Sequence, residues 1–432
     1  MTEKKASRRC FLRQASLASM AAGIAVGTAP ALKAQMEMMP SAGTAAASSP
    51  GGAAPPGNPT DRLAYGVRSR HEKTLRSFDV DPLHMHFGRM MNVYTPLQDL
   101  VGSITPTSLH FVSAHGYVPP DIEPTSHRLM IQGMVDRPLV FTVDELKQLP
   151  ATSRIMYLEC QANRPEYKAE RVDLSFGKTA CVQWTGVLLS VLLKEAGVRA
   201  DAKWIVAEGS ENGRMTKSTP LSKAMDDALI AYGMNGEAIR PENGYPLRLL
   251  VPGFEAIHSV KWVRQIKVTD RPYMGFQELS RYSPRNPKGI EFTFAQGAKS
   301  VITNPSAGQQ LTRQGFHEIR GLAWSGGGRV SKVEVSVDGG KSWKEAALQG
   351  PVLPVAHTRF TLPWNWNGEE AMLMSRCTDE LGEVQPTLAQ FAKFWGATSA
   401  EFLAGTASGA GHSNSIQPWG VRKDGSIYNA IS

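Results

Sequence analysis

The sequence predicts two folded domains, an α+β domain followed by an all-β sandwich of immunoglobulin-like type. Three observations predict this architecture. Between residues 62 and 298, strand-like runs mix with amphipathic helices but lack the regular strand–helix–strand rhythm of a doubly wound sheet. Between residues 299 and 396, short alternating strands are separated by turn residues. Hydrophobic residues make up 42% and charged residues 20% of the 432-residue chain, which is ordinary for a globular protein.

The first 34 residues have the features of an export signal. A basic head precedes a mildly apolar run from Ala15 to Ala29 and small residues suited to cleavage. The pair Arg8-Arg9, followed by Phe-Leu, is typical of a twin-arginine signal, which directs proteins that fold before export, commonly around a cofactor. The alternative is an ordinary secretory signal. We therefore expect a periplasmic protein exported by the twin-arginine pathway.

Residues 35–61 are rich in Ala, Gly, Ser and Pro and predict a disordered linker. Without the first 34 residues the chain keeps 41 basic and 38 acidic residues, so the formal charge of +8 falls to +3. This near-neutral balance gives no reason to expect nucleic-acid binding. No later segment is long and apolar enough to predict a membrane span.

The first domain is predicted from four strand-like runs and one helix. The runs cover residues 153–160, 203–208, 246–252 and 259–268. Within residues 184–198, apolar residues recur at helical spacing, and Gly197 is a suitable helix end. Those apolar residues are Leu188, Leu189, Leu192, Leu193 and Ala196.

The second domain is predicted from a hairpin in residues 332–346. Alternate valines precede an Asp338-Gly339-Gly340 turn, and a second strand carrying Trp343 follows. Short strands after this hairpin complete the predicted sandwich. Residues 397–432 are polar, with an Asp424-Gly425 turn, and predict a tail that lies over a surface or a partner.

Several kinds of site are absent from the sequence. It has no GxGxxG opening a helix and no Walker loop, so nucleotide binding has no support. It has no HExxH zinc motif and no CxxCH, so no covalent haem is expected in this chain. His84-x-His86 is a weak metal pair, because two histidines without further nearby ligands are more often surface residues.

The positions of the cysteines in the sequence leave one thiol as a candidate functional group. The mature chain keeps Cys160, Cys181 and Cys377, and an odd count leaves at least one outside an internal disulfide. Cys181 and Cys377 fall in different predicted domains, so we expect two buried thiols. Cys160 follows an apolar strand and precedes Asn163 and Arg164. Its thiolate could be a soft metal ligand, or Cys160 could be a small core residue, and its position alone leaves both interpretations open.

Four ordered segments carry a resemblance to a known family. They are ITPTSLHFVSAHGYVPP, LECQANRPEY, GYPLRLLVPG and SVKWVRQIKV, and a β-sandwich follows them. In this order they resemble the sulfite oxidase family of molybdopterin enzymes over about residues 80 to 395. Further segments, among them KSVITNPS and NSIQPW, are most similar to the molybdenum subunits of bacterial Sox sulfane/sulfite dehydrogenases. The resemblance implies a molybdopterin-binding catalytic domain (62–298), an immunoglobulin-like dimerisation domain (299–396) and a C-terminal tail (397–432).

The resemblance also implies roles for individual residues. Cys160 would ligate molybdenum of the molybdopterin cofactor. The residues implied to contact the cofactor are His115, Arg248, Ser259, Val260 and Lys261. The residues implied to act on the substrate are Tyr282, Arg164, Lys261 and His258.

Three positions depart from the family pattern. Ser113 and His258 stand where the family usually has arginines that bind the sulfur oxyanion, and Asn243 stands at a cofactor-contacting histidine. Loss of two guanidinium groups removes bidentate anion recognition, which Ser113 cannot replace. The cofactor pocket therefore looks retained while the substrate pocket looks altered.

The function implied is oxidation of sulfite or a sulfane or other sulfur oxyanion, with electrons passed to a separate c-type cytochrome. We expect a homodimer or a heteromer with the cytochrome, and the hypothesis is that the tail around Trp419 and the basic residues near the pocket help to dock it. One alternative is an enzyme on the same scaffold that acts on another sulfur compound or an S-oxide. Another is a cofactor-binding partner protein without turnover.

Overall fold

The computed structural model describes residues 68–78, 92–113, 118–166, 169–283, 285–286, 289–290, 292–405 and 411–431. The chain divides into two compact units, Met1–Thr74 and Leu75–Ser432, and the helices and strands given below belong to the second. None of the described helices has the length and apolar character needed to cross a membrane. The predicted export signal, the linker at 35–61 and the pair His84-x-His86 lie outside the described residues.

The larger unit begins with short elements that precede the main sheets. Strand β1 pairs antiparallel with β2, and two 3-10 helices follow. Their bounds are β1 (Ser77–Phe78), β2 (Val93–Tyr94), η2 (Leu97–Asp99) and η3 (Thr107–Leu109).

The first main sheet is antiparallel and carries the candidate site at one end. Its order is β10-β9-β6-β5, and β11 also pairs with β9. The strands are β5 (Thr152–Glu159), β6 (Thr179–Leu188), β9 (Leu229–Met234), β10 (Glu237–Ala238) and β11 (Arg248–Leu250). Between them lie α4 (Val172–Phe176), α5 (Leu189–Ala196), α6 (Leu221–Asp226) and the 3-10 helix η4 (Pro241–Asn243).

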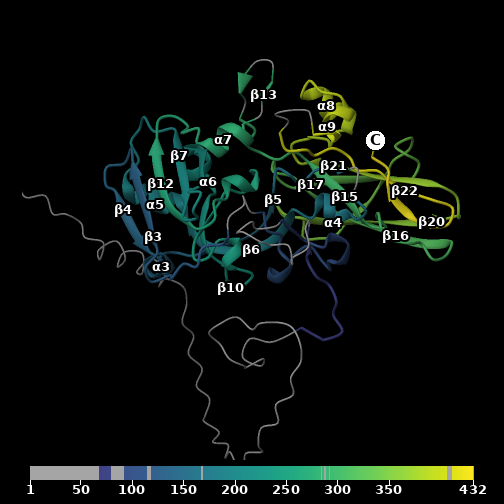
Figure 1. The fold of residues 1–432 in the computed structure, drawn as a ribbon, viewed down its shortest axis with the longest axis horizontal. Helices are drawn as coiled ribbons and strands as arrows, with labels where there is room; N and C mark the ends of the chain where they lie inside the picture. The colour runs from purple at the N-terminus through teal and green to yellow at the C-terminus, as the bar shows by residue number, and fades with distance from the viewer. Residues whose placement is uncertain are drawn as a thin grey trace, which may run out of the picture. The chain divides into compact units, whose positions relative to one another are not determined.

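The second main sheet has the order β4-β3-β12-β7-β8, in which only the β3–β12 pair among the described strands is parallel. Its strands are β3 (Arg128–Gly133), β4 (Leu139–Thr142), β7 (Trp204–Gly209), β8 (Thr216–Pro220) and β12 (Val263–Thr269). Around it lie α3 (Val143–Lys147), η5 (Ala256–His258) and α7 (Phe276–Arg281), followed by the β13–β14 hairpin (Arg285–Asn286 and Gly289–Ile290). Figure 1 shows this sheet on the opposite side of β5 and β6 from the C-terminal strands.

Two predicted elements are shorter in the structure than in the sequence analysis. The helix begins only at Leu189, because residues up to Leu188 pair with β9 as part of β6. It ends as predicted, with Gly197 in the left-handed conformation at φ 70°. The strand expected over 259–268 begins at Val263, because Trp262 has a positive φ of 52° and interrupts the extended backbone.

The C-terminal domain consists of two antiparallel sheets, with the orders β15-β16-β20-β19 and β18-β17-β21-β22-β23. Its strands are β15 (Lys299–Asn304), β16 (Gly315–Trp324), β17 (Val330–Ser336), β18 (Lys344–Glu345), β19 (Ala347–Leu348), β20 (Thr358–Trp366), β21 (Ala371–Asp379), β22 (Trp419–Val421) and β23 (Ile427–Asn429). Helices α8 (Leu388–Phe394) and α9 (Ser399–Leu403) lie between β21 and β22. The predicted α+β domain and β-rich second domain are confirmed, and so is the β17–β18 hairpin, although Trp343 immediately precedes β18.

The expectation that the polar tail lies over a surface is wrong for residues 419–429. Strand β22 pairs with β21, and β23 pairs with β22, so the tail completes a sheet of the sandwich. Trp419 is fully buried, and its indole N–H donates to the Ile302 carbonyl at 2.9 Å. A side chain without exposed surface cannot contact a partner, so Trp419 itself does not form a docking surface in this arrangement. Docking by the rest of the tail and by the basic residues near the pocket stays a prediction.

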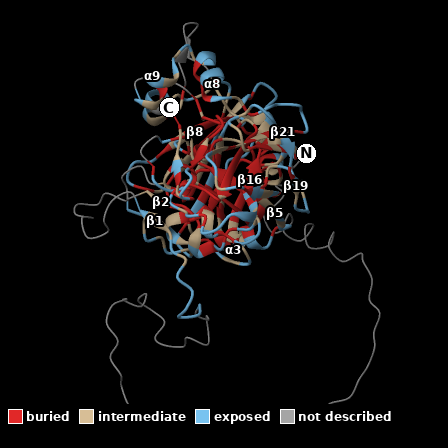
Figure 2. Ribbon diagram, turned by 90° about the vertical axis from the view of Figure 1, so that its right-hand side faces the viewer, coloured by how far each residue is buried: buried red, intermediate tan, exposed pale blue. Residues whose placement is uncertain are grey.

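The core joins the two domains through the β5–β6 pair. Alternation along β5 directs Tyr157 into the core of the sandwich and Met156 and Leu158 into a second core. Figure 2 shows buried residues concentrated in the strands at the centre of the view, around β16. Cys181 and Cys377 lie in the sandwich core as free thiols, which confirms that expectation, and burial raises the pKa of Cys181 to about 12. Strand β5, which ends just before Cys160, therefore packs against a hydrophobic core on each of its two faces.

Candidate active site

A pocket opens where β5 ends, and Cys160 is the first residue after that strand. The Cys160 N–H donates to the Lys178 carbonyl at 3.0 Å, and the Asn163 N–H donates to the Cys160 carbonyl at 2.9 Å. These bonds form a turn that leaves the Cys160 side chain partly exposed at the pocket wall. The thiol packs against the edge of the second core, but it is only partly buried and is not in a disulfide, which favours the ligand interpretation over that of a buried core residue.

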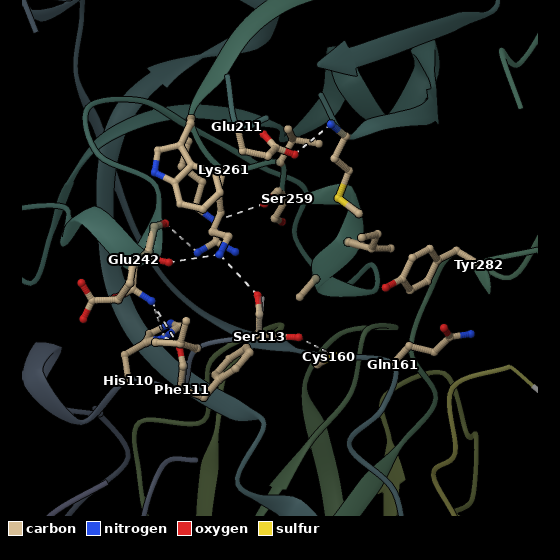
Figure 3. Close-up of a pocket in the computed structure, with 18 residues that line it drawn as sticks. His110, Phe111, Ser113, Cys160, Gln161, Glu211, Glu242, Ser259, Lys261 and Tyr282 are labelled. Carbon is tan, nitrogen blue, oxygen red and sulfur yellow. Dashed lines mark hydrogen bonds between the residues drawn. The ribbon is translucent and has the colours of Figure 1, made fainter. Parts of the chain in front are cut away.

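Ser113 is the immediate neighbour of the thiol. Its hydroxyl oxygen lies 3.5 Å from the Cys160 sulfur, and its backbone carbonyl accepts from Lys261 at 3.3 Å. The position that the family resemblance assigns to an arginine is therefore occupied by a small neutral group next to the sulfur. Figure 3 shows Ser113 between Cys160 and Lys261.

Two cations form one side of the pocket. The buried Arg248 guanidinium donates to the carbonyls of Ser259 at 3.1 Å and Asn243 at 2.9 Å, and Lys261 also donates to the Glu242 carbonyl at 3.1 Å. Burial lowers the pKa of Arg248 to about 9, and burial together with the Arg248 charge lowers the pKa of Lys261 to about 7. Both shifts arise because positive charge is poorly solvated here, so a bound anion would be stabilised.

Two neutral acceptors face the same space. His110 is buried, which lowers its pKa to about 3, and its Nδ1 donates to the Phe111 carbonyl at 2.7 Å. Its Nε2 is therefore an acceptor, and this atom and the Asn243 Oδ1 are buried without a hydrogen-bonding partner in the described structure. Acceptors without partners at a pocket wall suit the N–H groups of a heterocyclic ligand.

Tyr282 and Glu211 complete the pocket. Tyr282 follows α7, and its hydroxyl is directed into the pocket from the side opposite His110 (Figure 3). Burial raises the pKa of Glu211, whose Oε1 accepts from the Met215 N–H at 2.8 Å and whose Oε2 has no hydrogen-bonding partner among the described groups. Sequence analysis missed Glu211 because one acidic residue in a loop carries no pattern.

The structure brings six of the predicted site residues around one pocket, namely Cys160, Arg248, Ser259, Val260, Lys261 and Tyr282. The Ser259 hydroxyl accepts from the Val251 N–H at 3.1 Å, which fixes this short segment beside Arg248. His115 lies outside the described residues, so its predicted contact stays a prediction.

His258 and Arg164 do not face this pocket. His258 is fully buried, its Nδ1 lies 3.0 Å from the Thr219 hydroxyl, and its ring packs against Phe254 and Phe294. Burial holds the pKa of His258 well below its usual value, so the ring is neutral and cannot hold an anion as predicted. Arg164 pairs with Glu166 at 3.5 Å and lies over the Phe402 ring of α9, so its predicted substrate role is not supported.

The residues present fit a molybdopterin. A soft thiol can bind the metal, the Arg248–Lys261 pair can bind a phosphate, and His110 and Asn243 offer acceptors to a pterin ring. Fold and pocket together define the class of protein, a molybdopterin-dependent oxidoreductase. The chain matches the oxidoreductase molybdopterin binding domain over residues 115–277 and the Mo-co oxidoreductase dimerisation domain over residues 292–401.

The chain belongs to the sulfite oxidase family of molybdopterin oxidoreductases. It is 36% identical to the crystal structure of the sulfane dehydrogenase SoxCD from Paracoccus pantotrophus, with a TM-score of 0.72, over 86% of this chain and 99% of that chain. It is 28% identical to mitochondrial sulfite oxidase of Rattus norvegicus over 76% of this chain and 66% of the relative. It is 31% identical to NADH nitrate reductase of Solanum lycopersicum over 68% of this chain. The matched region spans only 38% of that nitrate reductase.

Proposed function

We propose that this protein is a periplasmic molybdenum oxidoreductase that oxidises sulfite or a sulfane sulfur and passes the electrons to a separate c-type cytochrome. The observation that carries the proposal is the similarity to the sulfane dehydrogenase SoxCD along 99% of that chain, at 36% identity. The similarity to sulfite oxidase supports sulfur as the oxidised element. The Arg8-Arg9 signal supports export.

The bound molybdenum cofactor supplies the two-electron oxidation of sulfur. Cys160 would hold the metal, and Arg248 and Lys261 would hold the anionic part of the cofactor. His110 and Asn243, each with a buried acceptor atom, would accept hydrogen bonds from N–H groups of the pterin. The chain thus provides one soft ligand, two cations and two neutral acceptors for the cofactor.

The substrate enters a pocket that has fewer cationic side chains than the family pattern predicts. The Lys261 ammonium, which donates to the Ser113 carbonyl, attracts an anionic sulfur compound when it is protonated. The Tyr282 hydroxyl is placed to donate to a substrate oxygen. Because Ser113 is small and uncharged, the pocket suits a bulkier or less anionic sulfur group better than it suits free sulfite.

The test is a comparison of substrates and acceptors with the exported holoenzyme. Molybdenum is measured per chain, and turnover is then assayed with sulfite, thiosulfate, an S-oxide and nitrate, using ferricyanide and a c-type cytochrome in parallel. We expect one molybdenum per chain and oxidation of a sulfur compound with both acceptors. Nitrate or S-oxide reduction without sulfur oxidation would overturn the proposed direction of the reaction.

The same measurements address a non-catalytic role. A protein loaded with molybdenum that turns over no sulfur compound would favour a cofactor-binding partner protein. Periplasmic location is tested separately by cell fractionation of the wild type and of an Arg8→Lys/Arg9→Lys variant, for which we expect accumulation in the cytoplasm.

A further inference from the structure

Glu159, the residue before Cys160, is a fully buried carboxylate with hydrogen-bond donors at both oxygens. Its Oε1 accepts from the Asn163 side-chain amide at 2.7 Å and from the Lys299 ammonium at 2.6 Å. Its Oε2 accepts from the Trp324 indole at 2.7 Å, and the His412 Nε2 lies 2.9 Å away. These partners come from the turn itself, from β15 and β16, and from the segment after α9.

Lys299 uses all three of its ammonium protons at this place. Besides Glu159, it donates to the Asn163 carbonyl at 2.5 Å and to the Ser413 carbonyl at 2.8 Å. The side chain is fully buried, so no water competes for these protons. Lys299 therefore links the turn that carries Cys160 to the sandwich and to the C-terminal segment.

The link holds the turn at both ends. The Asn163 carbonyl accepts a hydrogen bond from the Lys299 ammonium, and the Asn163 side-chain N–H donates to Glu159. The Asn163 Oδ1 accepts from the Lys178 N–H at 2.9 Å. Residues 159 and 163, on either side of Cys160, are thus fixed by one ammonium group. Within the turn, Cys160 and Gln161 remain at the pocket wall.

A buried ion pair is weak evidence for stability, because the desolvation of two charges offsets their attraction. Among the described ion pairs, two have both side chains at most 2% exposed: Glu159–Lys299 and Lys217–Glu278. The second also borders the pocket, because the Lys217 ammonium lies 3.5 Å from the Tyr282 carbonyl. Both fully buried pairs therefore support pocket residues rather than distant parts of the core.

We propose that Glu159 and Lys299 are positioning residues, through which the β-sandwich sets the orientation of the Cys160 sulfur toward the metal. The inference rests on the proposed function in that Cys160 ligates molybdenum. It assigns the second domain a part in the redox site besides dimerisation. Neither residue touches the pocket space, so both act through the turn.

The experiment uses the full-length holoenzyme and two variants that leave no unpaired buried charge. Glu159→Gln/Lys299→Met replaces the pair by neutral groups, and Lys299→Arg keeps the charge but changes its geometry. The control is Ser300→Ala, on the same strand as Lys299. It removes buried hydrogen bonds to Gln385 and Ser375 but makes no change at the turn. The readouts are amide hydrogen exchange in a peptide covering residues 159–163, molybdenum content, and the thiolate-to-molybdenum charge-transfer absorption.

We expect at least about tenfold faster exchange in this peptide and a shifted charge-transfer band in the variants, with neither change in the control. Wild-type exchange and an unshifted band in a folded variant would overturn the proposal. Loss of folding in both variants would also overturn it, because the pair would then serve the whole fold. Hydrogen exchange does not depend on catalytic activity. If the wild type contained no molybdenum, the proposed function would be refuted, but the hydrogen-exchange comparison could still be made.

Discussion

The Ser113 hydroxyl lies 3.5 Å from the Cys160 sulfur, so a neutral group stands beside the proposed metal ligand at the position where the family resemblance predicts a guanidinium. Ser113→Arg is therefore expected to improve recognition of free sulfite. A hydrogen bond to a charged group contributes about 1.5–3 kcal/mol, so the KM for sulfite should fall about tenfold or more. Steady-state kinetics with sulfite and thiosulfate check this.

Ser113→Ala is the matched control for that substitution. It keeps the side chain small and adds no charge, so the KM for sulfite should change less than about threefold. An unchanged sulfite KM in the arginine variant, at normal molybdenum content, would show that position 113 does not determine substrate choice.

Cys160→Ser should remove the protein's bond to the metal, because a hydroxyl is a much poorer ligand than a thiolate for this soft site. We expect molybdenum content to fall severalfold and turnover to fall at least about a hundredfold. Metal analysis and assays of the exported protein measure both.

Cys377→Ala serves as the control, since this thiol lies in the sandwich core. This substitution should lower the free energy of unfolding by about 1–2 kcal/mol and leave activity unchanged. Full metal content and turnover in Cys160→Ser would refute the site.

The sequence could predict the pocket but not the directions of all its side chains. The family resemblance places Cys160 and Lys261 in the site, and both line the pocket. His258 lies close to Lys261 in the chain, yet the 3-10 helix η5 turns it toward Phe254, which a linear motif cannot show. Burial then keeps it neutral, so its charge could not be predicted from its identity.

Long-range partners were equally beyond sequence reasoning. Lys299 and Glu159 are separated by 140 positions, and each alone looks like an ordinary charged residue in or beside a strand. Only the packing of the sandwich against β5 brings them together. The tail illustrates the same limit, because its short strands β22 and β23 are stabilised by a sheet edge that the local sequence does not reveal.

Lys261 should make anion binding dependent on pH. Its pKa is lowered to about 7, so it is cationic below that pH and loses its charge as pH rises through it. For an anionic substrate we expect kcat/KM to fall about tenfold per pH unit on the alkaline side. A bound anionic cofactor shifts this decline to higher pH, because it favours the protonated form.

Lys261→Arg separates this effect from other titrations. Arginine keeps its charge throughout the accessible range, so the alkaline decline should disappear even if the maximal rate is reduced. The measurement is a pH profile of kcat/KM for both proteins at constant ionic strength. Identical alkaline limbs would assign the titration to another group.

Trp419 should contribute stability rather than partner docking, because it is fully buried and bonds to the Ile302 carbonyl at 2.9 Å. Trp419→Ala is expected to lower the free energy of unfolding by about 3–5 kcal/mol. Tyr428→Ala on β23 is the matched control, since Tyr428 is 37% exposed, and it should cost about 1 kcal/mol or less. Denaturant unfolding measures both. If Trp419→Ala instead left stability unchanged and slowed only reduction of the cytochrome, and not of ferricyanide, the tail would have to leave the sandwich to meet its partner.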